Sequence, residues 1–158
     1  MGGREGVIKL LLEHGDINPD IPDSNGGTPL SWAAGNGHSR VVKLLLGRQD
    51  VNPNIPDDDG WTPLSFAAYH GRSNVVELLL EREDVNPNIL DNDGESPLLL
   101  ASRHGRHVVV KLLLEREDVT PDIPNKKGLT PLSVASKNRH KAVVKLLQAR
   151  KSANLGTA

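Results

Sequence analysis

GWTPLSFAAYHGRSNVVELLL, residues 60–80, is one of four related segments in a chain of 158 residues. The other copies are GGTPLSWAAGNGHSRVVKLLL from Gly26, GESPLLLASRHGRHVVVKLLL from Gly94 and GLTPLSVASKNRHKAVVKLLQ from Gly128, so that successive copies begin 34 residues apart. A fixed period of this length indicates a repeat protein, in which each unit buries its apolar face against its neighbours.

The repeat divides the whole chain into similar units. Full repeats cover 23–56, 57–90, 91–124 and 125–158, and the last has a divergent tail. Residues 1–22 align with the second half of a unit, because Gly3 lies 34 residues before Gly37. We therefore expect one domain over residues 1–158, with a partial repeat at its start and a C-terminal capping repeat at its end.

Each unit is predicted to form two short antiparallel helices and an extended connector. In the second full repeat, Thr62 is a good N-cap, and Pro63 suits the first helical turn because its missing N–H needs no partner there. Gly71 suits the end of the first helix, and Ser73 is expected to cap the second. The second helix, around VVELLL, is apolar on nearly all sides, so it is stable only between neighbouring units. The predicted fold class is therefore all-α.

The unit resembles the ankyrin repeat, which runs roughly D-x-x-G-x-T-P-L-h-x-A-A and then G-H-x-x-V-V-x-x-L-L. Residues 57–68, DDDGWTPLSFAA, follow the first part, and Gly37-His38 with Val41-Val42 follow the second. The segments TPLSWAA and VNPN are similar in sequence to ankyrin arrays that are common in fungal proteins. The resemblance covers the whole chain, and it implies a solenoid of stacked antiparallel helix pairs with projecting connector loops or hairpins.

Three departures from the family pattern carry structural expectations. The family uses a first-helix histidine to tie units together; its place is taken here by Ser31, Ser65, Leu99 and Ser133. Fewer hydrogen bonds between units are therefore expected. Arg-x-Asp, as in residues 82–84, stands where a glycine usually ends the second helix. The connector carries an additional Asn-Pro-x-Ile-Pro element, so an open loop is expected in place of a regular hairpin.

Composition excludes several classes of protein. The chain is 37% hydrophobic and 25% charged, which is typical of a globular protein. It has no cysteine, so disulfides and thiolate metal sites are excluded and an intracellular, cytoplasmic location is favoured. No apolar run is long enough to span a membrane. The 19 basic and 20 acidic residues give no overall attraction to nucleic acid, and no membrane partner is expected.

Charge is distributed unevenly among the repeats. Residues 57–90 include two basic and seven acidic side chains, a balance of −5, whereas residues 125–158 include eight basic and no acidic ones. The acidic middle suits a basic partner. The basic end is interpreted as a solubilising cap, with an acidic partner as the alternative. That end lacks aromatic residues and any known motif for nucleic acid.

The run DDDG at 57–60 has the appearance of a calcium loop. Ile55, however, breaks the alternation of carboxylates before the glycine, and Phe66 stands where a bidentate glutamate is needed. The other repeats have fewer carboxylates at these positions. A solvated turn is therefore the favoured interpretation.

Catalysis and zinc binding are equally poorly supported. Ser65, His70 and Asp57 are the residue types of a catalytic triad. However, Ser65 belongs to the repeated framework, and no oxyanion hole is evident. His104 and His107 flank a helix break, and the further ligands that zinc needs are missing. We therefore expect no enzyme activity, no metal and no cofactor.

The two tryptophans occupy repeat positions of different character. Trp32 is predicted to be a core residue, because large or apolar residues also stand at the aligned positions, Phe66, Leu100 and Val134. Trp61 is aligned with residues that have nothing in common, Gly27, Glu95 and Leu129, so the framework does not dictate it. Two interpretations of Trp61 remain open: contact with a partner, or packing over its own loop.

Positions that vary between repeats define the predicted binding surface. They lie at the connector tips and at the ends of the first helices, positions that carry partner contacts on the concave face in the ankyrin family. The predicted partner-binding residues are Ser24, Asn25, Asp58, Asp59, Trp61, Tyr69, His70, Asn92, Asp93, Glu95, Arg103, His104, Lys126, Lys127, Leu129 and Lys137. The aromatic residues of the second full repeat form the centre of this strip.

The leading hypothesis is a non-catalytic scaffold that binds a partner protein through its concave face and connector tips. The alternative is an engineered or excised repeat array with no dedicated partner. The apolar helix predicted around Val7–Leu12 lacks a first-helix mate, so the chain is expected to be a monomer or a weak end-to-end dimer.

Overall fold

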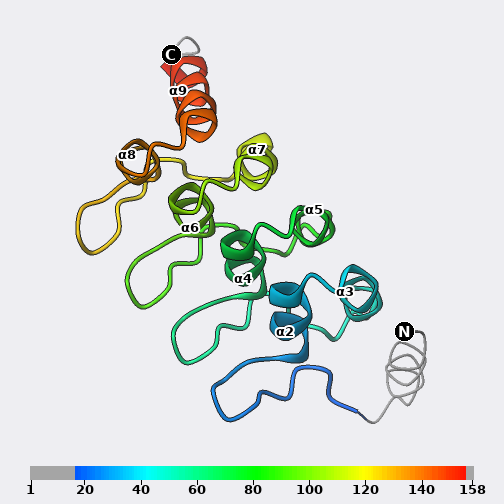
Figure 1. Ribbon diagram of the computed structural model, residues 1–158. Coiled ribbons are helices and arrows are strands. Elements are labelled where there is room, and N and C mark those ends of the chain that lie inside the picture. Colours follow the sequence, from blue (N-terminus) through cyan, green and yellow to red (C-terminus); the bar gives the residue numbers. More distant parts are fainter. Residues whose placement is uncertain (1–16, 156–158) are drawn as a thin grey trace.

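The computed structural model describes residues 17–155, and within them it has helices and connecting loops but no strand. The helices come in pairs (Figure 1), and their bounds are α2 Pro29–Asn36, α3 Ser39–Leu46, α4 Pro63–His70, α5 Ser73–Leu80, α6 Pro97–Arg103, α7 His107–Glu115, α8 Pro131–Lys137 and α9 Lys141–Leu155. The helix predicted around Val7–Leu12 lies outside the described residues.

The pairs stack side by side into an elongated solenoid. The first helices α2, α4, α6 and α8 form one row, and α3, α5 and α7 form a second row that α9 continues by packing on α7 and α8 (Figure 1). The connectors project as loops from one side of this stack. The predicted all-α solenoid of stacked helix pairs is confirmed.

The first helices begin and end where the sequence predicts. The Thr62 hydroxyl accepts a hydrogen bond from the Ser65 N–H, and Pro63 opens α4. Gly71 closes the helix in the left-handed conformation, with φ of 72°, which a residue without Cβ adopts at little cost. Ala67 and Ala68 are fully buried, and their small side chains let neighbouring first helices approach closely.

The second helices are buried as expected but begin differently. Val75, Val76 and Leu79 of α5 are fully buried. The N-cap of α5 is Arg72, which makes no side-chain capping bond, and Ser73 is already the first helical residue. The prediction that Ser73 caps this helix is therefore wrong. The Arg72 side chain instead reaches back to the preceding repeat, where its Nε donates to the Gly35 carbonyl at 3.1 Å.

Each connector ends in a tight turn that an acidic or amide side chain closes. The Asp57 carboxylate accepts hydrogen bonds at Oδ1 from the N–H groups of Asp59 (3.0 Å) and Trp61 (2.7 Å). The backbone N–H of Asp57 donates to the Trp61 carbonyl. No strand pairing accompanies this turn in the described residues, which agrees with the expected open loop.

Arginine side chains tie consecutive repeats together. Arg82 forms two hydrogen bonds with Asp84 and donates others to the carbonyls of Leu46 (3.3 Å), Arg48 (3.2 Å) and Val51 (3.3 Å) in the preceding repeat. Arg116 repeats this arrangement one unit later. The Arg-x-Asp departure therefore supplies hydrogen bonds between units, and the expectation that these bonds are fewer than in the family stays a prediction.

The additional Asn-Pro element of the connector supplies a second set of ties. The Asn54 side-chain amide donates to the Asp84 carbonyl at 2.6 Å and accepts from the Asn86 N–H at 2.8 Å. Asn88 makes the same pair of bonds with the repeat that follows. Both polar ends of each side chain are used, so these asparagines fix the register of one connector on the next.

Candidate protein-binding surface

The predicted binding residues lie on the inner face, which we define as the surface of α2, α4, α6 and α8 together with the connector turns at 23–27, 57–61, 91–95 and 125–129. None is buried. The exposed ones are Ser24, Asn25, Asp58, Asp59, His70, Asn92, Asp93, Lys126, Lys127 and Lys137, and the half-buried ones are Trp61, Tyr69, Glu95, Arg103, His104 and Leu129. The first and last turns are separated by two intervening repeats, so these residues form a strip and not one cluster.

The aromatic residues of the second full repeat lie in mutual contact. The Trp61 ring centroid is 5.1 Å from that of Phe66 and 5.0 Å from that of Tyr69. Tyr69 also contacts His104 of the next repeat, with ring centroids 4.3 Å apart. Trp61 therefore packs against aromatic residues of its own repeat and is half-buried, and its contact with a partner stays a prediction.

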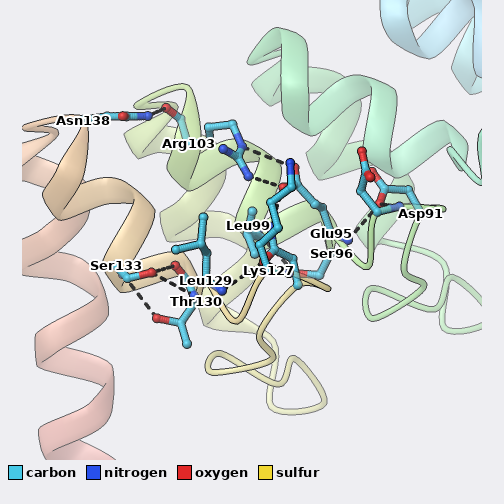
Figure 2. A network of polar contacts seen from close by, with 12 residues as sticks. Asp91, Glu95, Ser96, Leu99, Arg103, Lys127, Leu129, Thr130, Ser133 and Asn138 are labelled. Carbon is cyan, nitrogen blue, oxygen red and sulfur yellow. Dashed lines mark hydrogen bonds and ion pairs between the residues drawn. The ribbon is translucent and has the colours of Figure 1, made fainter.

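Glu95 and Arg103, both predicted to contact a partner, form an ion pair with each other (Figure 2). Glu95 also accepts a hydrogen bond at 2.8 Å from Asn125 of the next turn, and only 12% of its side chain is exposed. The Arg103 carbonyl accepts from the Asn138 side chain at 2.8 Å. The Glu95 side chain and the Arg103 carbonyl therefore join the third repeat to the fourth, and the Arg103 side chain holds Glu95 within the third repeat.

The connector turns are joined to one another along the stack. The Asp58 N–H donates to the Asn25 carbonyl at 3.1 Å, and the Asn92 N–H donates to the Asp59 carbonyl at 3.0 Å. Lys126 continues the series, because its N–H donates to the Asp93 carbonyl. The exposed side chains at these tips are therefore presented on an ordered backbone.

The prediction that Trp32 is a core residue is wrong. Its side chain is 59% exposed, whereas the aligned Leu100 and Val134 are each 2% exposed. The physical reason lies in two glycines. Trp61 and Tyr69 cover Phe66 in the second full repeat, but the corresponding positions beside Trp32 are Gly27 and Gly35. The sequence contains this signal, since both residues that would cover the ring are missing.

Asp23 holds the exposed indole of Trp32 in place. The indole Nε1–H donates to Asp23 Oδ2 at 2.6 Å, while Oδ1 accepts from the N–H groups of Asn25 and Gly27, each at 2.9 Å. The Trp32 hydrogen bond, followed by those backbone bonds, lowers the pKa of Asp23 below its ordinary value. Asp23 therefore carries a negative charge at neutral pH.

A hollow of about 290 Å³ lies beside Trp32, between the first and second full repeats. Its lining includes Trp32 and Phe66, and it also includes Gly27 and Gly35, which leave space because they carry no side chain. Asp23 and Asp57 line the connector side, and the residues at the helix-end side are His70 and Arg72. Sequence reasoning identified Asn25 and His70 as partner-binding residues but did not include the other residues of this hollow.

His70 and His104, the two histidines of the inner face, both have lowered pKa values, which favours their neutral form. Partial burial, and then the charges of Arg72 and Arg106, lower the pKa of His70. Partial burial, followed by Arg106 and Arg103, also lowers the pKa of His104. Protonation of either side chain is therefore disfavoured in the folded state.

The pKa shifts predict that the protein loses stability in acid in two stages. A lowered folded-state pKa of His70 and His104 means that the unfolded chain binds protons first, so the free energy of unfolding falls as pH drops through about 6.5. Hydrogen bonds from Arg48, Arg82 and Arg116 lower the pKa values of Asp50, Asp84 and Asp118, so a second loss is expected below about pH 4. Burial raises the pKa of Asp91, which partly offsets the second stage. Urea unfolding at pH 7.5, 5.5 and 3.5 measures both stages.

The first stage has a matched control. The double variant His70→Gln, His104→Gln removes the titrating imidazoles and keeps side chains of similar size. It should show no loss between pH 7.5 and 5.5 while the acid stage below pH 4 persists. An undiminished first stage in this variant would show that other groups cause it.

The Ser65 hydroxyl, which the sequence analysis considered as a nucleophile, is fully buried. Ser65 Oγ lies 3.0 Å from Thr62 Oγ1, inside the helix cap, so it serves the framework of the repeat. Across the described part of the chain, no three His, Cys, Asp or Glu side chains are grouped as metal ligands would be. Over the same residues, no helix is both long and apolar enough to cross a membrane.

The geometry defines a class of protein, a solenoid of stacked helix pairs with a continuous inner face. A family model described as ankyrin repeats (3 copies) matches residues 1–91 and 83–157. The chain therefore belongs to the ankyrin repeat family. A search of curated proteins found no significant match. Ankyrin repeat domains are generally non-catalytic modules for protein–protein interaction.

Proposed function

We propose that this chain is a non-catalytic scaffold that binds a partner protein through its inner face. The observation that carries the proposal is Trp32, a large aromatic side chain that is 59% exposed yet fixed by a hydrogen bond to Asp23. A rigid exposed aromatic ring loses little conformational entropy on binding and supplies a large contact area. The absence of cysteine suits a location inside the cell.

The remainder of the inner face fits the same role. Its tips offer exposed carboxylates and amides on an ordered backbone, and its centre is the Trp61–Tyr69–His104 contact. Aromatic residues at the middle of a patch with a polar rim are the usual composition of a protein-binding surface. Nothing in this arrangement requires a cofactor.

Peptide display tests the proposal. Peptides are selected from a displayed random library against the immobilised protein, and their Kd is then measured for variants. Trp32→Ala should weaken binding about tenfold or more, because central aromatic residues dominate interface energies. The double variant Asp58→Lys, Asp59→Lys changes two exposed residues at a connector tip and should also alter the affinity.

The control is a change on the other row of helices. Val108 of α7 is 46% exposed and lies away from the inner face, so Val108→Ser should leave the affinity unchanged. Selected peptides that are insensitive to the inner-face variants would refute the proposal. Circular dichroism of each variant shows whether it is folded.

A further inference from the structure

We propose that the hollow between the first two full repeats binds an arginine side chain of the partner, whose guanidinium pairs with Asp23 and Asp57 beside the ring of Trp32. This inference rests on the proposed function and specifies the chemistry of the partner. It follows from the shape of the hollow, its charges and the rings that line it.

The hollow is open at a place where the next repeat is filled by side chains. Trp61 and Tyr69 fill the equivalent space one repeat later, whereas Gly27 and Gly35 leave it open. A volume of about 290 Å³ is at the lower limit of pockets that take whole small molecules, so one long side chain is a better match. A side chain entering here would lie between the rings of Trp32 and Phe66.

The connector side of the hollow carries uncompensated negative charge. Asp23 and Asp57 both line it, and no cationic side chain within residues 17–153 forms an ion pair with either. Asp57 uses Oδ1 for two backbone N–H groups, which leaves Oδ2 for a ligand. The neighbouring Asp58 and Asp59 are exposed and add to the negative field that attracts a cation.

The cationic residue on the opposite side is already engaged. Arg72 directs its Nε to the Gly35 carbonyl, and it stands at the helix end, opposite the carboxylates. His70 contributes no charge at neutral pH, because burial lowers its pKa. The hollow is therefore polarised, with its acidic end at the connectors.

Arginine satisfies these features together better than lysine does. Its planar guanidinium stacks on aromatic faces, and its fork of N–H donors can reach two carboxylates at once. Its aliphatic stem gains contact with the rings while the charged end reaches Asp57. A lysine ammonium would satisfy the charge but not the stacking.

The test is an NMR titration of the whole chain with the peptide acetyl-Gly-Arg-Gly-amide. The two indole Nε1–H signals, assigned with Trp32→Phe, report separately on Trp32 and Trp61. The Trp32 signal should move on titration and the Trp61 signal should stay. The same peptide with citrulline, which keeps the shape but not the charge, should bind about tenfold more weakly, and the lysine peptide should lie between them. Raising NaCl should weaken the binding of the arginine and lysine peptides and leave that of the neutral citrulline peptide unchanged.

Two variants test the site, and the repeats themselves show that both are compatible with the fold. Gly35→Tyr fills the hollow with the residue that the next repeat carries, and a Cβ at Gly35 would lie 3.5 Å from Phe66, an ordinary contact. Asp57→Asn removes charge but keeps the Oδ1 acceptor, as Asn125 does in the last full repeat. Each should weaken the arginine peptide about tenfold. The matched controls, Gly47→Tyr and Asp91→Asn, make the same changes away from the hollow and should have no effect. Gly47 is exposed at the end of α3, and an added Cβ there would lie 3.4 Å from the nearest carbonyls, an ordinary contact.

Equal affinity for the arginine and citrulline peptides would overturn the inference, as would a response unaffected by Gly35→Tyr. If displayed peptides still depend on Trp32 and the exposed tips but show no preference for arginine, this inference fails and the proposed function stands. If the displayed peptides do not bind the inner face at all, the proposed function itself fails.

Discussion

Replacing Arg82 by alanine is expected to lower the free energy of unfolding by about 3 kcal/mol. The side chain is 22% exposed, and its guanidinium joins Asp84 to carbonyls of the preceding repeat. Alanine leaves those carbonyls and the Asp84 carboxylate without their charged partner. Hydrogen bonds to charged groups contribute more than neutral ones, and several are lost together. Urea unfolding followed by circular dichroism at pH 7 measures the change.

Two companion variants separate this tie from general charge effects. Arg82→Lys keeps the charge but cannot reproduce the forked geometry, so it should recover less than half of the loss. Lys111→Ala removes an exposed lysine whose Nζ lies 3.7 Å from Glu115, and it should cost only about 0.3–0.5 kcal/mol. An Arg82→Ala protein as stable as Lys111→Ala would show that the guanidinium does not couple the repeats.

Replacing Gly60 by alanine is expected to cost about 2–3 kcal/mol, because two separate penalties act at this position. Gly60 has φ of 84°, a conformation that L residues with a Cβ rarely adopt. A Cβ here would also lie 2.9 Å from both the Asn92 nitrogen and the Asp91 Cα, which are backbone atoms of the adjacent turn. Since backbone atoms cannot rotate away, the turns must separate, and the Asn92-to-Asp59 hydrogen bond would weaken. Urea unfolding at pH 7 again gives the magnitude.

The last full repeat supplies the matched control for Gly60→Ala. Gly128 has a similar φ of 73° at the equivalent position, but an added Cβ would meet nothing within 4 Å. Gly128→Ala should therefore cost only the conformational penalty, about 1 kcal/mol. If both alanines cost the same, close packing of neighbouring turns contributes nothing to the larger effect.

Short-range signals were the most reliable part of the sequence prediction. Thr62, Pro63 and Gly71 act within one or two helical turns of their own positions, and the structure places each as predicted. Ser73 was misassigned because it is already the first residue of the second helix; the N-cap is Arg72, whose side chain bonds to the preceding repeat. A local rule fails there because a partner outside the local segment determines the outcome.

The candidate surface was predicted less completely than the fold. Comparison of the repeats found residues at the tips and around Tyr69, and none of them is buried. Their role in binding a partner stays a prediction. Trp32 was assigned to the core because its aligned positions are apolar, but burial of a ring depends on its neighbours. Gly27 and Gly35 leave it uncovered, and this becomes visible only when facing positions are considered together.

The sequence by itself determined the period, the helix pairs and the stacking into an ankyrin solenoid, because helix caps and apolar patterns act over a few residues and then repeat. Only the tertiary structure decided what joins one repeat to the next and where the surface is open. Arg82 bonds to carbonyls 31 to 36 residues away, and the hollow is lined from two repeats at once. Such features depend on which side chains meet across a repeat boundary, and a pattern within one unit does not contain that information.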